Sequence, residues 1–139
     1  MTTKKTPSTP SPNAVQRPDQ VLAAAKAQLE AQKAYEKYAQ QRVDLNSRVG
    51  SLKNQIANEK VIISDLEKNR AAAAKALSQI RTSYPPPSAT TLANAIAAYN
   101  KTDDAVKAEQ AKLKNLEALL KTAESQLKQV DAAKKYIDF

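Results

Sequence analysis

Apolar residues recur at alternating intervals of three and four along the first half of the chain, from Tyr35 to Ile80. When these positions are named a and d of a heptad repeat, eleven of the fourteen are apolar and the phase never slips. The a positions are Tyr35, Arg42, Val49, Ile56, Ile63, Arg70 and Leu77, and the d positions are Tyr38, Leu45, Leu52, Glu59, Leu66, Ala73 and Ile80. Such a repeat predicts a long helix that packs along a narrow seam.

The second half of the chain carries a second repeat of the same kind, from Leu92 to Ile137. Its a positions are Leu92, Tyr99, Val106, Leu113, Leu120, Leu127 and Lys134, and its d positions are Ala95, Thr102, Glu109, Leu116, Ala123, Val130 and Ile137. Eleven of these fourteen positions are again apolar. The chain therefore contains two helices with matching seams.

Three consecutive prolines, Pro85 to Pro87, separate the two repeats. Proline lacks the amide donor of a helix interior, and it excludes the helical conformation from the residue before it. We therefore expect a stop, a stiff turn and a restart with Ser88 or Thr90 as the N-cap. The predicted fold class is all-α, with two long helices over about 19–82 and about 90–137 that form an antiparallel coiled-coil hairpin across a turn at 83–89.

A three-helix bundle is the alternative, because Gly50, the single glycine of the chain, weakens the first helix. The hairpin is favoured, since the seam passes through Leu45, Val49 and Leu52 without a change of phase.

The hairpin predicts which seam residues face each other. If Ile80 faces Leu92, then Glu59 faces Leu113 and Glu109 faces Ile63. We interpret both glutamates as polar positions that set the register or bind a partner. We expect Arg42 and Arg70 to bury their stems and extend their charged heads to solvent. Outside the seam, antiparallel pairing predicts contacts of Lys53 and Lys60 with Glu117 and Glu124.

Two segments extend beyond the predicted hairpin at its N-terminal side. Residues 1–17 are rich in Thr, Ser and Pro, and we expect an extended arm that is disordered on its own. Pro18 and Asp19 then suit the start of the hairpin domain, residues 18–139. Residues 19–34 have no counterpart on the second helix, and their apolar stripe of Leu22, Ala25 and Leu29 is left for a partner.

Composition excludes several classes of chemistry. Cysteine and histidine are absent, which removes thiolate chemistry and the commonest metal ligand. We expect no catalytic, metal or cofactor site, and we interpret Asp103 and Asp104 as solvated charges, since neighbouring helical residues point about 100° apart. We expect no membrane span and no secretory leader, hence a cytoplasmic location, or a virion location if the protein is viral.

Of the formal net charge of +8, the N-terminal tail carries +3, the first helix +4 and the second helix only +1. The cations alternate with Glu and Asp, without an Arg-rich block or interleaved aromatic residues. This pattern allows weak, nonspecific attraction to nucleic acid, and it does not indicate sequence-specific readout.

Three functions compete on this basis. The first is a non-enzymatic structural or assembly protein, a rod held in a larger complex such as a phage or virus particle. The second is an adaptor, because in general shape the hairpin is similar to the two-helix stalk and chaperone proteins of bacterial secretion ATPases. The third is a nonspecific nucleic-acid-associated protein.

The expected partners are other protein subunits of an assembly, or a second copy bound through residues 19–34. The candidate partner-binding residues lie in the arm, in the unpaired stripe and at the C-terminus. They are Lys4, Lys5, Arg17, Leu22, Leu29, Tyr136 and Phe139.

Overall fold

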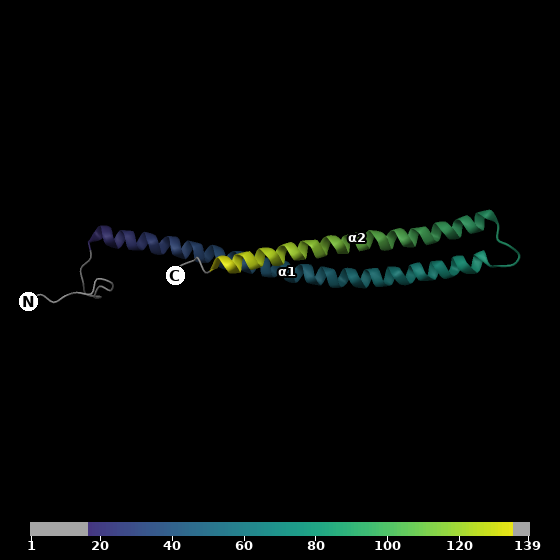
Figure 1. Cartoon of the computed structure of the whole chain (residues 1–139), viewed down its shortest axis with the longest axis horizontal. Coiled ribbons are helices and arrows are strands. Elements are labelled where there is room, and N and C mark those ends of the chain that lie inside the picture. Colours follow the sequence, from purple (N-terminus) through teal and green to yellow (C-terminus); the bar gives the residue numbers. More distant parts are fainter. Residues whose placement is uncertain (1–16, 135–139) are drawn as a thin grey trace, which may run out of the picture.

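The computed structural model describes residues 17–134, which form two antiparallel helices joined by a short loop (Figure 1). Helix α1 covers Pro18–Arg81 and helix α2 covers Ala89–Ala133. At about 1.5 Å per residue the two helices are roughly 95 and 68 Å long. The predicted fold class is confirmed, and contacts between α1 and α2 hold the hairpin together. The predicted arm and the end of the second helix, at residues 1–16 and 135–139, lie outside the described residues.

Helix α1 continues without interruption through Gly50. The three-helix bundle is therefore wrong. The a and d side chains on both sides of this glycine pack against α2, and Val49 and Leu52 form one apolar cluster with Ala123. Burial of this continuous seam outweighs the modest helix-breaking tendency of a single glycine.

The ends of the helices are closed by local hydrogen bonds. Pro18 is the first helical residue of α1, and the backbone N–H of Arg17 donates to the side-chain carbonyl of Gln20 at 3.2 Å. At the turn, Ser83 Oγ donates to the carbonyl of Ile80 at 2.8 Å. Ser88 is the N-cap of α2, and its Oγ accepts from the backbone N–H of Thr91 at 3.1 Å. The prediction of Ser88 as one of two N-cap candidates is confirmed.

The core is a seam one side chain wide, and it follows the predicted a and d positions. The buried residues are Tyr38, Val49, Leu52, Ile56, Glu59, Ile63, Val106 and Ala123. Val106 is fully buried and Ala123 is 1% exposed, whereas most other seam residues of α2 are half-buried. The chain thus buries little apolar area for its length, and stability rests on few side chains.

Two ion pairs across the seam keep the register constant. Arg42 Nε lies 3.0 Å from Asp131 Oδ1, and Arg70 Nη1 lies 3.0 Å from Asp103 Oδ1. The pairs are separated by the same number of residues on both helices, from 42 to 70 on α1 and from 103 to 131 on α2. The two seams therefore stay in step over four heptads.

Candidate assembly surface

The N-terminal part of α1 extends past the end of α2, as Figure 1 shows. Residues 17–37 are exposed, apart from the half-buried Ala31. We call residues 19–34 the overhang. Its side chains Val21, Leu22 and Leu29 are 51%, 56% and 52% exposed. The two leucines proposed from the sequence thus lie on a helix that α2 does not cover.

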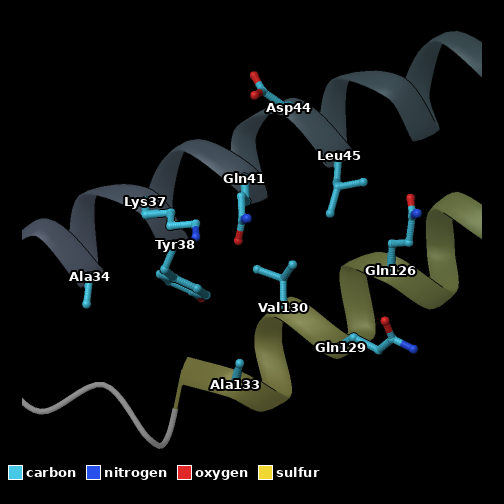
Figure 2. Close-up of a pocket in the computed structure, with 10 residues that line it drawn as sticks. All are labelled: Ala34, Lys37, Tyr38, Gln41, Asp44, Leu45, Gln126, Gln129, Val130 and Ala133. Carbon is cyan, nitrogen blue, oxygen red and sulfur yellow. The ribbon is translucent and has the colours of Figure 1, made fainter.

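A groove of about 620 Å³ lies where the overhang meets the end of α2. Its lining residues come from both helices and are Ala34, Lys37, Tyr38, Gln41, Asp44, Leu45, Gln126, Gln129, Val130 and Ala133. Figure 2 shows Tyr38, Gln41 and Leu45 directed from α1 toward Val130 on α2. The groove therefore has an apolar floor, and glutamine side chains from both helices lie at its sides.

A cluster of polar contacts fixes the end of α2 against α1 beside this groove. Tyr38 is buried, and its hydroxyl donates to Asp131 Oδ1 at 3.3 Å. The same carboxylate oxygen forms an ion pair with Arg42, and Lys134 Nζ lies 5.9 Å from the centre of the Tyr38 ring. A carboxylate held by a cation and a hydroxyl is oriented by charge-assisted hydrogen bonds. This cluster, which we call the end clasp, sets the place where α1 becomes unpaired.

The seam arginines do more than extend their heads to solvent. Arg42 belongs to the end clasp, and Arg70 binds Asp103 nearer the turn. Asp103 is also 2.9 Å from Lys107 Nζ, one turn along α2. The hydrogen bonds from Lys107 and then from Arg70 lower the pKa of Asp103 below its ordinary value. The expectation that Asp103 is only a solvated charge is therefore wrong, because its partner is a seam residue of the other helix.

The predicted contacts of Lys53 and Lys60 with glutamates of α2 do not form ion pairs. The ion pairs recorded among residues 17–134 across the seam start from Arg42 and Arg70 instead. Exposed lysines gain little from such pairing, since solvent screens the charges and an ordered side chain loses entropy. The Arg70 side chain is 31% exposed, so part of it is already packed in the seam and less entropy is lost on pairing.

Glu59 and Glu109 meet each other, which corrects the prediction that each faces an aliphatic residue alone. Glu59 is 8% exposed, and the carboxyl group of Glu109 acts on its ionisation. Lys112 Nζ donates to Glu109 Oε1 at 3.1 Å. The bond to Glu109, then burial, raise the pKa of Glu59, while the bonds from Glu59 and Lys112 lower the pKa of Glu109. The pair therefore holds the pKa values of its two carboxyl groups apart, above the ordinary value for Glu59 and below it for Glu109.

The sequence contained a signal for this pair that facing-residue pairing alone overlooks. Glu59 lies one helical turn from the position that faces Glu109, and both occupy d positions. A glutamate side chain spans that offset, about 5.4 Å along the axis. Polar seam positions one turn out of register should therefore be examined as pairs.

The loop between the helices presents an aromatic side chain to solvent. Tyr84 is 94% exposed and precedes the three prolines. The loop lies at the closed end of the hairpin, opposite the overhang in Figure 1. The two ends of the rod thus differ in kind, one being a proline turn and the other an unpaired helix with a groove.

The candidate partner-binding residues divide into two groups. Arg17, Leu22 and Leu29 lie in the described part at the open end of the hairpin, where Arg17 Nε is 3.5 Å from Asp19 Oδ1. Lys4, Lys5, Tyr136 and Phe139 lie outside the described residues.

Residues 17–134 contain no group of three or more acidic side chains placed to hold a metal ion. Within the same range, neither helix has a stretch long and apolar enough to cross a membrane. Comparison with protein-family models, with curated proteins and with solved structures finds no match to the chain.

Proposed function

We propose that the protein is a non-enzymatic assembly protein, a rigid hairpin rod that is held in a larger complex through its open end. The observation that carries this proposal is the overhang, a helix whose Val21, Leu22 and Leu29 are about half exposed beside a groove with an apolar floor. The partner is a protein subunit that supplies a helical or extended apolar segment. The compositional argument for a phage or virus particle component remains part of this proposal.

The physical support is that apolar side chains of the overhang are exposed to solvent and have no second helix to pack against. Isolated helices of about 12–15 residues or fewer are marginal in water, and most helical stability in proteins comes from packing an apolar face. The overhang carries such a face without covering it. Amphipathic helices are commonly bound in this way, with anchors at helical spacing laid against a groove. Leu22 and Leu29 are one heptad apart and suit that mode.

The experiment is site-specific photocrosslinking with a photoreactive amino acid incorporated into the chain. A photoreactive amino acid replaces Leu22 or Leu29, and in a matched control it replaces Val61. Val61 is 62% exposed on the same helix, in the middle of the hairpin. We expect discrete protein adducts from positions 22 and 29 in the cells that make the protein, and none from position 61. Absence of adducts from both overhang positions, or an equal pattern from position 61, would refute the proposal.

The composition of the adduct separates the alternatives. An adduct of twice the chain mass identifies a second copy, and light scattering on gel-filtered protein then gives the copy number. An adduct with one other protein identifies a hetero-partner, which includes the adaptor or stalk hypothesis. A nuclease-sensitive adduct that no longer forms when crosslinking is carried out at high salt supports the nucleic-acid hypothesis instead, since phosphate binding is strongly salt-dependent.

A further inference from the structure

The closed end of the hairpin carries an excess of positive charge that the rest of the described chain lacks. Residues 68–102 contain five cations and no acid, whereas residues 17–67 contain eight cations and seven acids, and residues 103–134 contain six of each. The five cations are Lys68, Arg70, Lys75, Arg81 and Lys101. The alternation of cations with acids that the whole sequence suggests therefore fails over this stretch.

Four of these cations have no compensating charge, since Arg70 alone is bound by an acid of α2. We call the four the basic end, and they are Lys68, Lys75, Arg81 and Lys101. All are exposed, and none belongs to an ion pair recorded among residues 17–134. They lie in the last four turns of α1 and the first four turns of α2. At about 1.5 Å per residue, all are within about 20 Å of the proline turn along the rod.

An aromatic ring lies in the turn between these cations. Tyr84 is 94% exposed, and the hydrogen bonds that close the turn involve Thr82, Ser83 and Ser88 instead. An exposed ring of this kind offers a flat face on which another flat ring can stack. A hollow of about 290 Å³ lies nearby, and its lining residues are Ala74, Leu77, Ser78, Arg81 and Tyr99. The closed end thus combines unpaired cations with accessible aromatic surface.

The placement of these groups distinguishes between anionic ligands. Salt screens exposed charges beyond about 8–10 Å. A flat anionic surface that meets the turn end-on would therefore interact with Arg81 and Tyr84, but hardly with Lys68, which lies about 20 Å along the rod. A flexible chain of phosphates can follow the helices and reach all four cations. Stacking on an exposed ring further requires unpaired bases, which a single strand offers.

We propose that the closed end of the hairpin binds single-stranded nucleic acid, with phosphate groups held by the four cations of the basic end and an unpaired base stacked on Tyr84. Phosphate contacts carry no sequence information, so binding is independent of sequence. The site lies at the opposite end of the rod from the overhang. It goes beyond the proposed assembly function and does not depend on it, because a rod held at its open end leaves this end accessible.

The first test measures binding of the full chain to a fluorescently labelled thymidine oligonucleotide of about 20 residues by anisotropy. One variant replaces all four cations of the basic end by glutamine. The matched control removes the same charge from exposed lysines elsewhere on the rod, as K26Q, K53Q, K121Q and K128Q together.

The salt dependence of binding reports the number of phosphate contacts. Each contact with a single strand contributes about −0.7 to the slope of log affinity against log salt concentration. Four contacts predict an affinity that falls about 50-fold between about 50 and 200 mM salt in the wild type and in the control. In the basic-end variant, binding should be weak and nearly independent of salt. Equal losses in both variants would overturn the proposal, because net charge rather than the basic end would then govern binding.

The second test concerns the stacked base. Y84A should weaken binding of the oligonucleotide by about 5- to 150-fold, the loss expected when one stacked base is released, while Y84F keeps the ring and the affinity. Tyr84 is 94% exposed, so neither variant should disturb the fold, and circular dichroism checks this. A duplex of the same length should bind more weakly and be indifferent to Y84A. Unchanged affinity in Y84A, or equal binding of duplex and single strand, would contradict a single-strand site.

Anionic lipid vesicles provide the final comparison. The chain is sedimented with vesicles that contain phosphatidylserine, under the salt conditions of the oligonucleotide assay. We expect less binding to the vesicles than to the oligonucleotide, because few cations of the basic end can reach a flat surface at once. Binding to the vesicles without binding to the oligonucleotide would identify a membrane-binding end and overturn the proposal.

Discussion

Replacing Val106 by Ala tests whether the hairpin depends on its few fully buried side chains. Val106 is fully buried between the two helices, whereas Val61 is 62% exposed on the outer face of α1. The same substitution at both positions removes the same two methyl groups from a helix. The difference between V106A and V61A therefore isolates burial from helix propensity.

The expected magnitudes can be worked from these exposures. Burial of two methyl groups stabilises by about 1.6 kcal/mol. The cavity that they leave adds about 1 kcal/mol where neighbours relax only partly. Alanine returns about 0.5 kcal/mol because it is a better helix former than valine. V106A should thus lower the free energy of unfolding by about 2 kcal/mol, while V61A should change it by about 0.5 kcal/mol or less.

The assay is urea unfolding of the two variants and the wild type at one pH, followed by helical circular dichroism. The slope of the transition should be equal in all three, so that midpoints report stability. Equal midpoints for V106A and V61A would refute the reasoning, because they would mean that the seam at Val106 is not packed as described. A lower slope for V106A alone would instead show that less surface is exposed in its cooperative unfolding transition.

Two further predictions concern single features of the helices. G50A should raise the free energy of unfolding by about 0.5–1 kcal/mol in the same urea assay, because beyond the neighbouring backbone of α1 no atom lies within 4 Å of the added Cβ and alanine is the better helix former. A loss of stability would contradict an unbroken α1. D103N should flatten the loss of stability on acidification. The lowered pKa of Asp103 means that its contribution is present above 3.8 and is lost as pH falls through the lower folded value. Thermal melts from about pH 2 to about pH 5 measure this loss, and an unchanged acid limb in D103N would contradict the role of its contacts with Arg70 and Lys107.

The end clasp explains why the overhang begins where it does. Asp131 accepts a hydrogen bond from Tyr38 and forms an ion pair with Arg42, so the last turn of α2 is fixed to α1 by two different groups. An α2 that frayed here would cover less of α1 and enlarge the overhang. The proposed docking surface therefore depends on polar contacts at its border as well as on the exposed leucines.

The heptad pattern alone determined most of the architecture. Spacing of three and four residues decides locally which side of a helix is apolar, and three prolines decide locally where a helix must end. The hairpin, its turn, the Ser88 cap and the seam positions could therefore be predicted from the order of residues. Leu22 and Leu29 could be proposed for the same reason, since a second helix that is too short leaves them without a partner.

Only the tertiary structure decided how polar groups meet across the seam. Glu59 meets Glu109, and Arg42 and Arg70 find Asp131 and Asp103. Neighbouring layers of the seam are about one turn, or about 5.4 Å, apart. A long charged side chain can reach either layer, and the choice depends on which layer offers a partner and excludes water. That choice is an electrostatic property of two helices together, so the periodicity of one helix does not contain it.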